Sequence, residues 1–94
     1  MNLENRVSIP AQVMARDVGG ETVILNLESG IYFGLDAVGA RIWQLLSEHK
    51  TLAEVRDSIV ETYDVSSGDA ERDLLSLFEQ LQSQKLVEIV HPGN

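Results

Sequence analysis

The segment Leu27–Asp36, LESGIYFGLD, decides how the rest of the chain is interpreted. Its residues Glu28-Ser29-Gly30 are typical of a turn, and Ile31 to Leu35 then predict a short, mostly apolar strand. Side chains alternate between the two faces of a strand, so Tyr32 and Phe33 must point in opposite directions. One aromatic ring can enter a core, and the other is left to contact something else.

The chain before this segment alternates as β-strands do. Two β-suitable runs, residues 12–18 and 21–27, flank the pair Gly19-Gly20. Such a pair is typical of a two-residue hairpin, because both glycines tolerate positive φ. With residues 31–35, these runs predict a three-stranded antiparallel meander in which the quoted strand lies last in line or at an edge.

Two short apolar runs lie near the ends of the chain. Val7 and Ile9, stopped by Pro10, are expected to form a short arm against the meander. The run Leu86 to Val90 predicts a last strand that is stopped by Pro92-Gly93.

After Asp36 the apolar period changes from two to 3.6, which predicts helices. Asp36 can cap the first helix, Thr51 and Glu54 have capping-box spacing before the second, and Ser66 opens a third that ends near residue 84. The apolar stripes of the three helices are Val38, Ile42, Leu45 and Leu46; Leu52, Val55, Ile59 and Tyr63; and Ala70, Leu74, Leu77, Phe78 and Leu81. The order of elements predicts an α+β domain of winged helix-turn-helix type that spans residues 1–94, with a core from about residue 12 to 90.

Composition limits the function. The 94 residues suit one small domain, and the absence of cysteine excludes disulfides and thiolate metal sites. The chain has no signal peptide and no membrane span, so we expect a soluble, cytoplasmic protein. Its 15 acidic and 7 basic side chains give a net charge of −8, which repels nucleic acid and anionic lipid.

The sequence offers no catalytic or cofactor motif. His49 and His91 lack the spacing of a metal site, and no phosphate-binding loop follows the glycines near residue 20. The acidic residues Asp69, Glu71 and Asp73 fall in the first turns of a helix, where carboxylates suit the helix dipole. We therefore expect no enzyme activity, no metal and no cofactor.

The winged-helix outline makes a DNA-binding regulator the alternative. A recognition helix should carry Lys or Arg for phosphates and base edges. The third predicted helix, however, has several carboxylates and the single basic residue Arg72. Charge therefore argues against DNA binding. A third possible class is an uncharacterised interaction or structural domain.

A meander instead leaves strand edges that can accept another strand. Gly34 removes a side chain where a second backbone could approach. On the third helix, Leu75 lies about 100° from Leu74, off the buried stripe. The strand and this flank of the helix are expected to line a peptide groove.

The runs ETVILNLESGIYFGLDAVGARIWQLL and TLAEVRDSIVETYDVSSGDAERDLLSLFEQLQSQKLVEI resemble the PqqD-like proteins, also called RiPP precursor peptide recognition elements. The shared features include LxxxSGxYxxLD, GxxIWxLL, a TxxE-led second helix and the YDVS junction. The chain looks particularly similar to the stand-alone members of lasso-peptide biosynthesis. It departs from the family at Gln84-Lys85, where a glycine is expected to close the helix.

The resemblance implies a non-catalytic domain of peptide-derived natural-product biosynthesis, the class to which PQQ biosynthesis belongs. The leader region of a ribosomally made precursor peptide would bind as an added antiparallel strand, under the third helix, and be presented to a leader peptidase or a radical-SAM enzyme. Phe33, which shares a face with Ile31 and Leu35, would be buried, whereas Tyr32 would contact the guest and Gly34 would leave room for it. The implied peptide-binding residues are Ile31, Tyr32, Phe33, Gly34, Leu35, Leu74, Leu75 and Phe78.

Overall fold

The computed structural model describes residues 3–19 and 21–90. Its elements are β1 (Arg6–Ser8), β2 (Val13–Val18), β3 (Glu21–Asn26), β4 (Tyr32–Leu35), α1 (Ala37–Ser47), α2 (Leu52–Tyr63), α3 (Ser67–Ser83) and β5 (Glu88–Val90). This order confirms the predicted α+β fold, with a meander, three helices and a short last strand. No described helix is both long and apolar enough to cross a membrane.

The predicted meander is confirmed. Strands β2, β3 and β4 form an antiparallel sheet in that order, and Val18 pairs with Glu21 across the first turn. Gly19 has a φ of +60°, as the expected hairpin requires, while Gly20 lies outside the described residues.

The expectation for the N-terminal arm is wrong. Val7 lies in β1, which pairs with β5 in a separate two-stranded sheet instead of lying against the meander. Val7 and Ile89 are register partners, and Val7 is only 1% exposed, so the buried cluster includes residues before the expected start near residue 12. The pairing joins segments from opposite ends of the chain, which local patterns do not reveal. His91 and Pro92-Gly93 lie outside the described residues.

Each helix begins at the predicted cap. The Asp36 carboxylate accepts a hydrogen bond from the Gly39 N–H at 2.7 Å. Thr51 and Glu54 form a complete capping box, and its hydrogen bond from the Thr51 N–H to Glu54 lowers the pKa of that carboxyl group. The Ser66 hydroxyl caps α3 by accepting from the Asp69 N–H.

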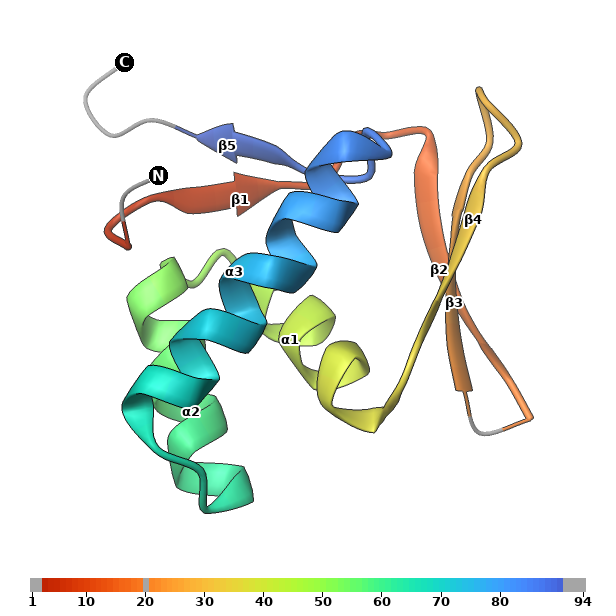
Figure 1. The fold of residues 1–94 in the computed structure, drawn as a ribbon. Helices are drawn as coiled ribbons and strands as arrows, with labels where there is room; N and C mark the ends of the chain where they lie inside the picture. The colour runs from red at the N-terminus through yellow and green to blue at the C-terminus, as the bar shows by residue number, and fades with distance from the viewer. Residues whose placement is uncertain (1–2, 20, 91–94) are drawn as a thin grey trace.

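The helices and the meander share one buried cluster. Helix α1 packs against β3 and β4 on one side and against α2 on another, and α2 packs against α3. Figure 1 shows the β2–β4 sheet standing beside α1, with the β1–β5 pair at the other end of the molecule near α2 and α3. One face of the sheet therefore meets helices, and both of its edge strands remain accessible.

Candidate functional site

Strand β4 is an edge strand that pairs only with β3 among the described residues. The Asn26 N–H donates to the Ile31 carbonyl at 2.9 Å, which fixes the hydrogen-bonding phase of the ladder. Hydrogen-bonded pairs alternate along antiparallel strands, so Phe33 and Leu35 bond to β3. The N–H and C=O groups of Tyr32 and Gly34 consequently point to the open edge, where a further strand could pair with them.

A groove of about 400 Å³ runs beside this edge, between β4, the start of α1 and α3. The groove is mostly apolar, and its polar rim comes chiefly from Asp36, Asp73 and Gln80. Its lining residues are Phe33, Gly34, Leu35, Asp36, Val38, Gly39, Ile42, Asp73, Leu77 and Gln80. An unpaired strand edge beside an apolar groove offers both backbone hydrogen bonds and side-chain contacts to an extended peptide.

The predicted strand residues lie at this groove or next to it. Tyr32 is 74% exposed on the face that points away from the helices, so its ring is free to contact a guest. Leu35 is buried, whereas Phe33 is only half-buried and Ile31 is 42% exposed. The predicted common face of these three residues is therefore right, but the predicted burial of Phe33 is wrong, because the groove separates β4 from α3.

The structure places the predicted helix residues differently. Leu74 and Phe78 are fully buried in the core and present no surface to the groove. Leu75 is half-buried and is not among the lining residues, because it lies on the other flank of α3. The flank that faces β4 carries Leu77, together with Asp73 and Gln80 one turn on either side.

Asn26 is a positioning residue that the sequence analysis missed. Asn26 is only 3% exposed, and its Oδ1 accepts from the N–H groups of Glu28 and Ser29 at 2.9 and 3.2 Å. Its Nδ2 donates to the Lys85 carbonyl at 3.4 Å, just beyond the end of α3. One carboxamide thus ties the turn before β4 to the end of the helix on the other side of the groove.

The unexpected Gln84-Lys85 end of α3 still adopts the conformation that favours glycine. Lys85 has a φ of +60°, and its N–H donates to the Gln82 carbonyl at 3.0 Å. The Leu86 N–H reaches back to the Leu81 carbonyl at 2.9 Å, which completes a Schellman motif. The departure from the family pattern therefore changes the residue and leaves the turn intact.

No metal centre emerges from the described residues, in which no group of three His, Cys, Asp or Glu side chains converges. His49 follows α1 with a φ of 64°, and its carbonyl accepts from Arg6 Nε at 3.0 Å. This hydrogen bond of His49 is made by its backbone and is structural. His91 lies beyond the described part of the chain.

Comparisons with known proteins agree with this geometry. The family model described as "Coenzyme PQQ synthesis protein D (PqqD)" matches residues 21–87. A solved structure, "TbiB1 in Complex with the TbiA(beta) Leader Peptide", is 42% identical, covers 85% of this chain and 93% of its own, and has a TM-score of 0.79. A second, "Lasso peptide synthetase B1 complexed with the leader peptide", is 25% identical, covers 88% and 98%, and has a TM-score of 0.82. A search of curated proteins found no match.

Proposed function

The chain belongs to the PqqD family, and we propose on that basis that it is a non-catalytic module that binds the leader region of a ribosomally synthesised precursor peptide. Both solved relatives are named as complexes with leader peptides, one of them a lasso peptide synthetase component. Lasso-peptide biosynthesis is therefore the pathway class that we assign to this chain.

The observation that carries the proposal is the open edge of β4 beside the apolar groove. An added antiparallel strand would exchange hydrogen bonds with the outward N–H and C=O groups of Tyr32 and Gly34. Every second guest side chain would then point toward the helices and enter the groove beside Phe33 and Leu77. Backbone bonds supply affinity for any extended chain, and the groove supplies selectivity.

We propose that the helix side of the site consists of Asp73, Leu77 and Gln80. These three residues line the groove, whereas Leu74 and Phe78 support it from the core. On the strand side, Ile31, Tyr32, Phe33, Gly34 and Leu35 remain the proposed contact residues.

The bound peptide is presented to a separate enzyme, either a leader peptidase or a radical-SAM enzyme. A guest held along four residues of β4 leaves the rest of the precursor outside the groove, where such an enzyme can reach it. Residues 1–94 act as one recognition domain, because the meander and all three helices contribute to the same buried cluster.

Charge disfavours the alternative of a DNA-binding regulator. The exposed side of α3 carries Asp69, Asp73 and Glu79, and the one basic residue, Arg72, is already paired with Asp69. A helix of this kind lacks the cations that release counterions from phosphates. A mobility-shift titration at low salt should show no duplex binding, and micromolar binding there would favour the regulator instead.

Amide chemical-shift mapping tests the proposed function. The probe is the leader peptide of the 42% identical relative, titrated into the ¹⁵N-labelled chain. We expect shifts at Tyr32 and Gly34 and along the Leu77 side of α3. Shifts confined to α2 or β5, with β4 unchanged, would contradict the proposed groove.

A further inference from the structure

The groove beside β4 carries charge of only one sign. Among its lining residues only Asp36 and Asp73 are charged, and both are exposed carboxylates. Asp73 lies on the same face of α3 as Leu77 and Gln80, so its side chain is turned toward β4. The Asp36 carboxylate lies where β4 ends and α1 begins, and its Oδ1 accepts from the Gly39 N–H at 2.7 Å.

The two carboxylates lie at the same end of the groove. The last turn of α3, at Ser83, shares a hollow with Ile31 at the start of β4. Asp73 comes earlier on the helix and therefore lies toward the other end of the strand. The hollow at the start of β4 is lined by both Glu28 and Lys85, so neither sign of charge dominates there.

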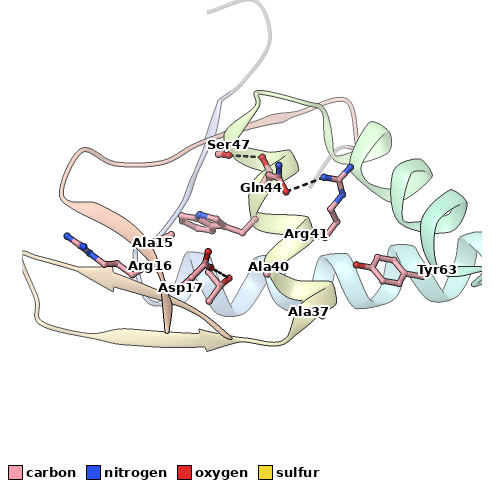
Figure 2. A pocket seen from close by; sticks show the side chains of 11 residues that line it. Ala15, Arg16, Asp17, Ala37, Ala40, Arg41, Gln44, Ser47 and Tyr63 are labelled. Atoms are coloured by element: carbon pink, nitrogen blue, oxygen red, sulfur yellow. Dashed lines mark hydrogen bonds between the residues drawn. The ribbon is translucent and has the colours of Figure 1, made fainter. Parts of the chain in front are cut away.

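No cation of the chain neutralises the acidic end. None of the 7 basic side chains lines the groove. Arg72 lies about 100° around α3 from Asp73 and pairs with Asp69 instead. Arg41 belongs to a separate hollow on the β2 side of α1, where it donates to Gln44 Oε1 at 3.2 Å (Figure 2). Neither groove carboxylate has an ion pair within the part of the chain that the structure describes.

An antiparallel guest on β4 brings its N-terminal end to these carboxylates. Strand β4 runs from Tyr32 to Leu35, so the guest runs from the Leu35 end toward the Tyr32 end. Guest side chains opposite Phe33 and Leu35 lie on the groove side of the sheet. A lysine or arginine opposite Leu35, or two residues before that position, packs its apolar stem in the groove and extends its charge toward the carboxylates.

We infer that the β4 groove selects leader peptides with a lysine or arginine at the N-terminal end of the paired segment, and that Asp36 and Asp73 are the specificity-determining residues. This inference rests on the proposed function and adds a charge requirement to it. Asp73 carries the larger share, because the α1 N-terminus already offsets part of the Asp36 charge. A guest carboxylate at the same position meets two like charges, so the site also rejects acidic peptides.

A lysine and glutamate scan of a leader peptide tests this selection. The probe is the leader peptide of the 42% identical relative, made in two series in which each residue in turn is lysine or glutamate. Calorimetry gives the ratio of the glutamate to the lysine dissociation constant at each position, and amide shifts of Tyr32 and Gly34 report binding at β4. Positions at which both substitutions weaken binding mark the side chains that enter the apolar groove.

The shape of this ratio along the peptide is the expected result. The net charge of −8 favours lysine slightly at every position. At the N-terminal end of the paired segment, we expect a peak that exceeds the ratio elsewhere about fivefold.

Variants assign the peak to the two carboxylates. Asp73→Asn should remove most of the peak, and Asp36→Asn a smaller part, since asparagine still caps α1. Asp73→Lys should favour glutamate over lysine at the peak position. The matched control Glu79→Gln removes an α3 carboxylate that does not line the groove, and should leave the peak unchanged. All three positions are exposed, so each variant should fold.

Three results would overturn the inference while the proposed function stands. They are a flat ratio with the Tyr32 and Gly34 shifts intact, a peak that the Asp73 variants leave unchanged, and a peak at the C-terminal end of the paired segment. Absence of the Tyr32 and Gly34 shifts with every version of the peptide would instead refute leader binding at β4, and the inference with it.

Discussion

Replacing Gly34 with proline should weaken leader-peptide binding strongly while leaving the fold intact. The Gly34 N–H points to the open edge of β4, so its loss breaks no bond to β3. The residue before a proline must be extended, and Phe33 already lies in the strand. A folded variant that lacks one binding donor is therefore expected.

The magnitude follows from the number of groups that the edge offers. Only Tyr32 and Gly34 turn their backbone groups outward along the four residues of β4, so each donor is a large part of the total. A lost hydrogen bond costs about 0.5–1.5 kcal/mol, and a guest carbonyl left unsatisfied beside the proline ring raises the cost to about 1–3 kcal/mol. The dissociation constant should rise by about 5- to 150-fold.

Gly34→Ala is the matched control, because it keeps the N–H. A Cβ at this position meets nothing within 4 Å, and Gly34 does not have a positive φ, so alanine imposes no strain. Calorimetric titration with the leader peptide of the 42% identical relative measures both variants, and thermal unfolding checks that each is folded. Equal affinity of the proline and alanine variants would refute strand addition at β4. A strong loss of affinity in the Gly34→Ala variant would instead show that the guest needs the space that glycine leaves open.

Four further outcomes are expected. Leu77→Asp should weaken leader binding by about 1–3 kcal/mol, because it places a charge against an apolar guest, while Leu75→Asp on the other flank should leave the titration unchanged. Asn26→Ala should lower the free energy of unfolding in urea by about 1–3 kcal/mol, since the Glu28 and Ser29 amides lose the acceptor that the buried Asn26 supplies; an unchanged midpoint would contradict this role. Lys85→Gly should raise the free energy of unfolding by about 0.5–1 kcal/mol, because glycine adopts positive φ without a steric cost, and Lys85→Ala should not. The hydrogen bond from the Thr51 N–H holds the pKa of Glu54 below its ordinary value of 4.5 in the folded chain. The stabilisation that the carboxylate provides is therefore complete above pH 4.5 and is lost as the pH falls through the folded-state pKa. The free energy of unfolding should exceed that of Glu54→Gln by more at neutral pH than in acid.

Local signals in the sequence predicted most of the fold. The caps at Asp36, Thr51 and Ser66 are short-range features, and each is confirmed with the expected hydrogen bond. The meander also follows from local turns and alternation. The pairing of β1 with β5 was missed because it joins the two ends of the chain, and three-residue strands carry too little pattern to reveal a partner.

The site was predicted less completely, for a geometric reason. Helical spacing shows that Leu75 and Leu77 lie off the centre of the buried stripe, on opposite flanks. It does not show which flank faces β4, since that depends on how α1 carries the chain from the sheet to the helices. Asn26 was missed because an asparagine at the end of a strand is common near turns, and only the structure brings it beside Lys85.

Strand β4 is held at both ends, which suits it to its proposed role. Before it, the Asn26 carboxamide fixes the turn and links it to the end of α3. Directly after it, Asp36 caps α1 through the Gly39 N–H, and Leu35 is anchored in the core. A template strand fixed in this way loses little conformational entropy when a guest adds to it. The ordering cost then falls mainly on the leader peptide, so that affinity depends on how readily the leader itself becomes extended.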